Sequence, residues 1–286
     1  MKVLVTGDQG FIAKRLIWKL NRDFTVFGID VDDFMESDDW QQELANIVAD
    51  ISPDVIFHIG ACSDTMEQDV NYMMKLNYES TKILASYCHY TGCKLIYSSS
   101  AANYGSDGKH PSNLYGWSKY AAEDYVTLTG GVALRYFNVY GPGEEHKGRM
   151  ASIAYQSYVN HSNGVPVLLF PKNPTRDFVH VDDVVSANLH ALENYEDFAS
   201  NWFEVGSGES RPFEDILNLM EIPFTYVPED VIPQGYQFHT VSNQNLWLGG
   251  WTPAHTIDTG VPAYLEYFGL PSTTAEELRR VAQLSY

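Results

Sequence analysis

The sequence predicts an α/β fold, in which a doubly wound parallel sheet is followed by a smaller C-terminal α/β lobe. Two observations lead to this prediction. Short apolar strands alternate with segments of helical periodicity through the first half of the chain, as in sheets covered by helices on both faces. In addition, a glycine-containing turn joins the first strand to the first helix at residues 7–13, which is typical of Rossmann-type domains.

Composition narrows the class of protein further. The chain has 286 residues, of which 44% are hydrophobic and 14% aromatic, as in folded globular proteins. Its 37 acidic and 18 basic side chains give a net charge of −19, which repels nucleic-acid backbones and anionic membranes, so we expect neither as a partner. No apolar run approaches the ~18 residues of a membrane span, and no signal peptide precedes the first strand.

The three cysteines, Cys62, Cys88 and Cys93, lack the spacing of metal ligands, so we expect no metal site. We interpret Cys88 and Cys93 as buried small side chains, with a pair between them as the alternative. An odd number of cysteines fits a reducing compartment, and we expect a cytoplasmic protein.

The first strand, Lys2–Thr6, leads into the turn Gly7-Asp-Gln-Gly10-Phe-Ile-Ala13 and then into a helical pattern that runs to Leu20. Gly7 permits a tight turn, and Gly10 lets a pyrophosphate approach the backbone. The helix N-terminus, with Phe11 and Ile12, offers N–H groups to the phosphates. The turn therefore predicts a dinucleotide site, with a purely structural turn as the alternative. We expect the Asp8 side chain to point into solvent.

The second strand, Thr25–Ile29, ends in Asp30, 23 residues after Gly7. A carboxylate at this place can accept hydrogen bonds from the adenosine ribose. Asp32 and Asp33 follow, and no arginine or lysine appears before Lys75. Because a 2′-phosphate would face acidic groups here, we expect NAD rather than NADP.

The elements that follow continue the alternation of helices and strands. A helix is expected over 38–51 with Asp38 or Asp39 as its N-cap, a buried strand over 54–58, a helix over 70–90 and a strand over 94–97. The small residues Gly60, Ala61 and Cys62 follow the buried strand, where a cofactor can lie close to the backbone. With Asn77 on the next helix, and with Tyr115 and Lys119 further along the chain, they complete the expected cofactor contacts.

Tyr115 and Lys119 are four residues apart and so share one face of a helix. An ammonium near a tyrosine hydroxyl favours the phenolate and lowers the pKa of the tyrosine, which can then exchange a proton near neutral pH. Ser100 follows a strand end and can hydrogen-bond the oxygen that Tyr115 protonates. The alternatives are a solvated helix face for the pair and turn chemistry for the serine.

The order of these motifs resembles the extended short-chain dehydrogenase/reductase superfamily, which includes nucleotide-sugar epimerases, dehydratases and reductases. The segments 135–142 and 176–183 resemble its later signatures. Two further runs, Ala61-Cys-Ser-Asp-Thr65 and Glu145-His-Lys147-Gly-Arg-Met-Ala-Ser152, resemble the ADP-L-glycero-D-manno-heptose 6-epimerase family. Dehydratases of the superfamily carry an Asp-Glu pair after the catalytic hydroxyl residue, whereas Ala101 and Ala102 follow Ser100 here, which argues against dehydration.

The resemblance implies an NAD(P)-dependent isomerase with Ser100, Tyr115, Lys119 and Lys147 as its catalytic residues. Tyr115 and Lys147 would be two bases: the sugar is oxidised at C-6″, and the hydride returns to its other face. The alternative for Lys147 is an ordinary surface lysine. The alternative functions are a nucleotide-sugar 4-epimerase or reductase, and a non-catalytic sugar-nucleotide-binding protein, which would not need the Ser–Tyr–Lys set.

The expected partner is a nucleotide-diphosphate sugar, and its expected contacts come from several segments: Ser63, Asn138, His146, Phe170, Arg176 and Tyr236. The Arg176 guanidinium can bind phosphate oxygens in pairs, with an ion pair to Asp177 or Asp182 as the alternative. Phe170 can flank the nucleotide base, and Tyr236 is either a substrate contact or a packed aromatic.

The second half also shows helical patterns at 150–160, 181–192 and 213–220, strands at 165–170 and 202–205, and an amphipathic helix at 273–286. We therefore expect an NAD-binding domain over residues 1–140 and a mainly substrate-binding lobe over 141–286, with exchange of chain between them around 176–205. A homo-oligomer is expected.

Overall fold

The protein is built around one parallel sheet, as the computed structural model shows for residues 1–232 and 236–269. Six strands lie in the order β2-β1-β3-β4-β5-β9, and every neighbouring pair is parallel. Their bounds are β1 (Lys2–Thr6), β2 (Thr25–Ile29), β3 (Val55–His58), β4 (Lys94–Ser100), β5 (Val132–Tyr136) and β9 (Asn201–Val205). The predicted doubly wound α/β fold is confirmed.

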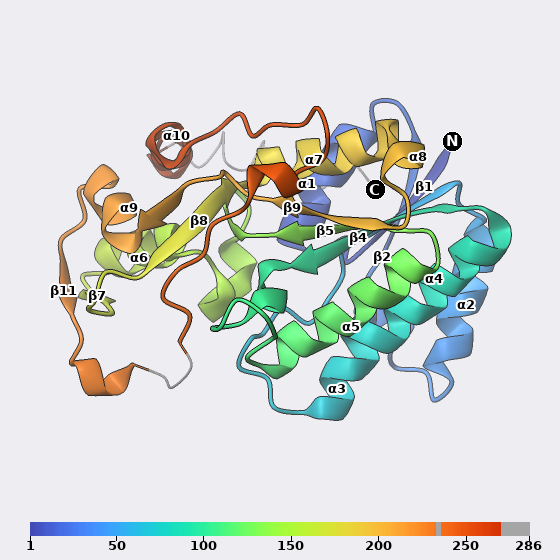
Figure 1. Ribbon diagram of the computed structural model, residues 1–286, viewed down its shortest axis with the longest axis horizontal. Helices are drawn as coiled ribbons and strands as arrows, with labels where there is room; N and C mark the ends of the chain where they lie inside the picture. The colour runs from blue at the N-terminus through green and yellow to red at the C-terminus, as the bar shows by residue number, and fades with distance from the viewer. Residues whose placement is uncertain (233–235, 270–286) are drawn as a thin grey trace.

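Helices cover both faces of this sheet (Figure 1). On one face lie α1 (Phe11–Leu20), α7 (Val181–Glu193) and the short α8 (Tyr195–Phe198), and on the other lie α2 (Trp40–Ile51), α4 (Ser80–Thr91) and α5 (Leu114–Leu128). Side chains alternate along a strand, so Val3 and Val5 of β1 join the core under α1, whereas Leu4 joins the core under α4. The strand ends are thereby held in register, and the loops that follow them meet at one edge.

The helix expected over 70–90 is present, with a local irregularity. It consists of α3 (Val70–Met74), a π-helical turn (Lys75–Glu79) and α4, which continue one another. A π turn shifts the side chains that it carries around the helix axis. Asn77 lies in this turn and is buried.

The second lobe packs beside the carboxyl edge of the sheet (Figure 1). Strand β8 (Thr175–His180) lies between β6 (Asn138–Tyr140) and β10 (Ser210–Pro212), and β7 (Val167–Leu169) pairs with β11 (Phe224–Tyr226). Helices α6 (Ile153–Ser162), α9 (Phe213–Leu219) and α10 (Ile257–Gly269) enclose a separate apolar core. The chain passes from this lobe back to the main sheet through α7 and β9.

Several expected boundaries were wrong by a few residues. The helix expected from 150 begins at Ile153, because Ser152 caps it: the Ser152 hydroxyl accepts a hydrogen bond from the Tyr155 amide at 3.3 Å. Residues Glu145–Met150 instead form 3-10 turns, with a kink at Gly148. Asp39 precedes α2, but its side chain makes no capping hydrogen bond. The strand expected over 165–170 is limited to β7.

Near the C-terminal end the structure contains one helix that the sequence did not predict, and one predicted helix cannot be compared with it. Helix α10 was not expected from the sequence, since Pro262 lies inside it and proline ordinarily interrupts a helical pattern. The amphipathic helix expected over 273–286 lies outside the described residues. Within those residues no helix combines the length and the apolar character needed to cross a membrane.

Candidate active site

The glycine turn lies where the ends of β1, β2 and β3 converge. Gly7 has φ +67°, and a Cβ on it would overlap the Cα of Gly60. Its amide also donates to the Ile29 carbonyl at 2.8 Å. Only residues without side chains allow this approach, so the turn leaves open backbone at the N-terminus of α1.

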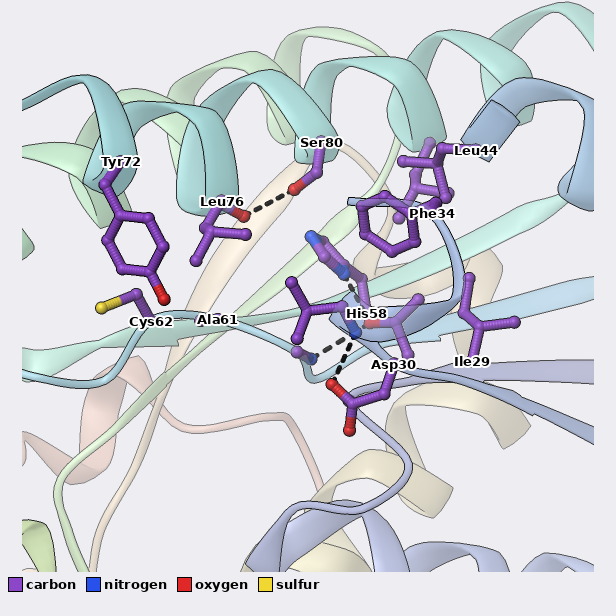
Figure 2. A pocket seen from close by; sticks show the side chains of 15 residues that line it. Ile29, Asp30, Phe34, Leu44, His58, Ala61, Cys62, Tyr72, Leu76 and Ser80 are labelled. Carbon is purple, nitrogen blue, oxygen red and sulfur yellow. Dashed lines mark hydrogen bonds between the residues drawn. The ribbon is translucent and has the colours of Figure 1, made fainter. Parts of the chain in front are cut away.

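A pocket beside this turn has the kind of lining expected for an adenosine, and Figure 2 shows its side chains. Asp30 lies at its rim, accepting hydrogen bonds from the amides of Gln9 at 3.1 Å and Val31 at 2.7 Å. A carboxylate has about four acceptor positions, so capacity remains for a ribose hydroxyl. Apolar side chains complete the pocket, namely Ile29, Phe34, Leu44, Leu76 and Leu84.

The expectation that Asp8 points into solvent was wrong. Its side chain is 6% exposed and lies against Gly28 of β2, where a Cβ would overlap the Asp8 carboxylate. Gln9 donates its side-chain amide to Asp8 at 3.3 Å. Burial, reinforced by the charge of Asp30, raises the pKa of Asp8 above its usual range. The glycine at position 28 provides the room for this carboxylate.

Asn77 lies behind the cofactor cavity rather than in its lining. Its side chain accepts from the Cys62 amide at 2.7 Å and donates to the Cys62 carbonyl at 3.0 Å. It also donates to the Ser118 hydroxyl at 3.0 Å. Asn77 therefore holds the loop after β3, which lines the cavity with Gly60, Ala61 and Cys62.

The cavity continues past the pyrophosphate turn toward the second lobe. Its middle part is lined by both expected cofactor residues and expected substrate residues, among them Gly10, Phe11, Ile12, Ser63 and His146. Asp64, which also lines this part, forms an ion pair with Arg149. Burial, together with the charges of Lys14 and Lys147, lowers the pKa of His146.

The inner part of the cavity brings together the four expected catalytic residues, Ser100, Tyr115, Lys119 and Lys147, and also Asn138. Ser100 ends β4, and Tyr115 and Lys119 lie on α5. Ser100 hydrogen-bonds Tyr115, which favours the phenolate, but burial is the larger effect and raises the pKa of Tyr115. This direction is opposite to the one expected from the sequence.

The reason lies in the position of Lys119. Its side chain is 1% exposed, and its Nζ lies 4.2 Å from the ring centroid of Tyr97. Burial lowers the pKa of Lys119 to about 7, although Glu123 opposes the change. A lysine so poorly solvated carries its charge only in part, so it offsets little of the cost of burying a phenolate.

Lys147 is not an ordinary surface lysine. Its side chain is 21% exposed, and its Nζ lies 5.0 Å from the ring centroid of Phe11 and 4.0 Å from Glu144 Oε2. Lys147 thus enters the cavity from the second lobe, whereas Tyr115 enters from the first lobe. Burial lowers the pKa of Lys147.

Three expected substrate residues form a cluster outside the linings of these cavities. Arg176 places its Cζ 5.1 Å from the ring centroid of Tyr236, and Phe170 contacts the same ring edge-on at 5.0 Å. The ion-pair alternatives for Arg176 were wrong. Asp177 accepts hydrogen bonds from Ser207 and Ser242, and Asp182 pairs with Arg15 at 2.6 Å.

Sequence reasoning missed the apolar walls and one buried acid. Met150, Phe137, Phe178 and Phe213 line the inner cavity, and Phe34 and Leu44 line the adenosine pocket. The signal for Phe34 is a large apolar residue four positions after Asp30 in an otherwise acidic stretch. Glu144, fully buried beside Lys147, directly precedes the 145–152 run.

One group of possible metal ligands occurs among the described residues, formed by His180, Asp182 and His255. Arg15 donates two hydrogen bonds to Asp182, and His180 Nδ1 accepts from the Asp182 amide at 3.2 Å. The Asp182 carboxylate and Nδ1 of His180 are therefore already hydrogen-bonded, and Nδ1 of His255 lies 3.0 Å from Asp183 Oδ1.

A glycine turn, an acidic residue ending β2 and a Ser–Tyr–Lys set at the carboxyl edge of a parallel sheet define a short-chain dehydrogenase-type enzyme with a dinucleotide cofactor. The chain belongs to the NAD dependent epimerase/dehydratase family, whose sequence profile matches residues 3–206. NAD is the cofactor of that family, and the adenosine pocket with Asp30 fits it.

The chain is similar to proteins of known activity. It is 34% identical to an ADP-L-glycero-D-manno-heptose-6-epimerase of Brachyspira hyodysenteriae, over 92% of this chain and 96% of that protein. Its structure resembles the Helicobacter pylori ADP-L-glycero-D-manno-heptose-6-epimerase, with a TM-score of 0.80 and 25% identity over 94% of this chain and 96% of that one. A UDP-glucose 4-epimerase of Thermotoga maritima shares the fold, with a TM-score of 0.83 and 24% identity over 94% and 99%.

Replacing Asp30 by Asn tests the cofactor preference. The change removes a charge that attracts ribose hydroxyls and repels a 2′-phosphate, so we expect NAD affinity to fall about tenfold, as for a lost charge-assisted hydrogen bond. The ratio of NADP to NAD affinity should rise. Titrations of cofactor-free protein measure both constants. Asp32→Asn, an equal charge change at an exposed neighbour, is the control; similar effects from both variants would contradict a direct role of Asp30.

Proposed function

We propose that this protein is an NAD-dependent epimerase that inverts C-6″ of an ADP-glycero-manno-heptose. The observation that carries the proposal is the arrangement of Tyr115 and Lys147, two proton-carrying groups that enter one cavity from different lobes. An epimerase needs such a pair, because the alcohol oxygen occupies different positions in the two epimers. The 34% identity to a heptose epimerase over nearly the whole chain supports this choice of sugar.

The roles of the residues follow from their positions. Bound NAD supplies the site that accepts a hydride and returns it. Tyr115 takes the proton of the hydroxyl that faces α5, and Ser100 holds the same oxygen by its hydrogen bond. Lys147 gives a proton to the oxygen after the ketone has turned toward the second lobe. Lys119 has a pKa of about 7, and the fraction that carries a charge near neutral pH is proposed to stabilise the Tyr115 phenolate in part.

The substrate contacts are assigned in the same way. Ser63, Asn138 and His146 line the cavity near Lys147 and are proposed to bind the sugar and its neighbouring phosphate. Arg176, which lies against the rings of Phe213 and Tyr236, is proposed to bind the nucleotide diphosphate. Arg176 is 8% exposed, so this contact requires a neighbouring side chain to move aside.

We also infer a homo-oligomer in the cytoplasm. Trp117 and Tyr120 on α5 are large exposed rings, and a second copy would cover them. The three cysteines are free thiols, as is usual in a reducing compartment.

The proposed function is tested with purified protein and ADP-D-glycero-D-manno-heptose, followed by NMR without added cofactor. We expect NAD to copurify, the configuration at C-6″ to invert, and no net reduced dinucleotide to form. Failure to convert this sugar, together with turnover of a UDP- or GDP-sugar, would exclude the heptose and identify a 4-epimerase or reductase. NAD binding without conversion of any sugar would indicate a non-catalytic protein.

A further inference from the structure

Glu144 is a fully buried acid directly behind Lys147. Its carboxylate accepts hydrogen bonds from the amide and hydroxyl of Ser152, both at 2.6 Å, and from the Tyr264 hydroxyl at 3.1 Å. The Gly141 amide approaches it at 3.4 Å. These partners come from α6, α10 and the end of β6, so three elements of the second lobe fix the carboxylate in place.

Lys147 contacts Glu144 through a backbone hydrogen bond and through the opposite charges of their side chains. The Lys147 amide donates to the Glu144 carbonyl at 3.0 Å, which closes one 3-10 turn and brings the two side chains to the same side. Lys147 Nζ then lies 4.0 Å from Glu144 Oε2, and the lysine also lines the cavity that holds Tyr115. Lys147 therefore lies between the buried carboxylate of Glu144 and the inner cavity.

A buried carboxylate is costly unless hydrogen bonds and a counter-charge compensate it. Hydroxyl and amide donors supply the hydrogen bonds to Glu144, and Lys147 supplies the counter-charge. The neighbouring acid, Glu145, is directed elsewhere and accepts from the Tyr267 hydroxyl at 2.8 Å. Packing and hydrogen bonding do not require a charge at position 144, because a neutral amide of the same size could also accept hydrogen bonds from Ser152 and Tyr264.

We propose that Glu144 is a positioning residue that keeps Lys147 in its ammonium form and directs it into the cavity. The inference rests on the proposed function, in which one base must begin without a proton and the other with one. Tyr115 takes the hydroxyl proton in its phenolate form, which burial disfavours and which the Ser100 hydrogen bond favours. Lys147 later breaks one N–H bond to form the O–H bond of the inverted alcohol, and the substrate is not oxidised overall.

The groups around Lys147 set the direction of the pH effect. Burial lowers the pKa of Lys147, and the negative charge of Glu144 opposes this change. His146 lies on the same turn and interacts with Lys147, and Lys14 of α1 acts on His146. Across the cavity Tyr115 and Lys119 face it from α5. Of these groups Glu144 is the acid in contact with Lys147, so removing its charge should favour the neutral amine.

The test is Glu144→Gln, with Tyr264→Phe as the matched control. Both variants weaken the same buried network, but only the first removes the charge. Lysines are reductively dimethylated with ¹³C-formaldehyde, and the Lys147 signal, assigned from its loss in Lys147→Met, is titrated by NMR. We expect its midpoint to fall by about one pH unit or more in Glu144→Gln and to stay in place in Tyr264→Phe, although both variants lose thermal stability.

A second readout separates this role from a merely structural one. In the reaction direction in which Lys147 donates its proton, the alkaline limb of the kcat–pH profile should move down with the NMR midpoint in Glu144→Gln, and not in Tyr264→Phe. An unchanged Lys147 midpoint in Glu144→Gln would overturn the proposal, as would a shifted midpoint with an unmoved alkaline limb. If no heptose is converted at all, the proposed function fails, whereas the NMR midpoint still tests the effect of Glu144 on Lys147.

Discussion

Replacing Lys147 by Met is expected to abolish epimerisation while leaving the cofactor bound. Methionine has a similar length and fills the space between Phe11 and Glu144, but it carries no proton. General acid–base groups contribute about 10²–10⁴-fold to rate, and epimerisation without the second base has no efficient route to complete. NMR of the heptose measures the loss in kcat, and the NAD content of the purified protein measures cofactor binding.

The matched control is Lys172→Met, at a lysine of the same lobe that is 54% exposed and pairs with Glu229 on the surface. This variant should keep full activity. In Lys147→Met, reduced dinucleotide should accumulate with the epimer whose hydroxyl faces Tyr115 and not with the other epimer, because only one of the two bases remains. Full inversion by Lys147→Met would show that a single base serves both positions of the oxygen.

The parts of this structure that the sequence predicted depend on short-range patterns. The turn at Gly7 and Gly10 and the pair Tyr115 and Lys119 lie within one strand–turn–helix or one helix. Their geometry follows from local backbone rules, since four residues complete about one helical turn. The convergence of these segments follows from the parallel order of strands, which brings their carboxyl ends to one edge.

The parts that could not be predicted depend on residues far apart in the chain. Asp8 is buried because Gly28 of the neighbouring strand leaves space for it. Glu144 is buried because Tyr264, 120 positions later, covers it. No local pattern reports either contact, and a carboxylate in a loop is usually solvated.

The direction of the shift in the Tyr115 pKa was predicted wrongly for a related reason. The spacing of Tyr115 and Lys119 placed them on one face of a helix, and the charge of Lys119 alone would lower the pKa of Tyr115. The outcome depends on how strongly each group is desolvated, which is set by packing against Tyr97 and the sheet. Burial raises the pKa of Tyr115 and the Ser100 hydrogen bond lowers it, and only the folded structure shows that burial is the larger effect.

Replacing Tyr115 by Phe is expected to reduce kcat in both directions by about 10²–10⁴-fold. The change removes one hydroxyl and its hydrogen bond to Ser100 but keeps the ring that packs at the start of α5. The fold and the adenosine pocket should be unaffected. Because Lys147 is the base that remains, reduced dinucleotide should accumulate with the epimer whose hydroxyl faces Lys147 and not with the other epimer, which is the reverse of the pattern expected for Lys147→Met. Rapid-mixing absorbance and NMR measure the two effects.

Tyr120→Phe is the matched control, since Tyr120 lies on the same helix, is 40% exposed and loses the same single oxygen. It should retain activity and NAD content. If Tyr115→Phe kept the activity of the control, the proton would have to leave through Ser100 or Lys119 instead. Among the described residues, the Ser100 hydroxyl has the Ala102 amide and Tyr115 as its hydrogen-bond partners, and Lys119 Nζ lies 4.2 Å from the centroid of the Tyr97 ring. The geometry of the inner cavity therefore leaves Tyr115 as the group through which the first proton passes.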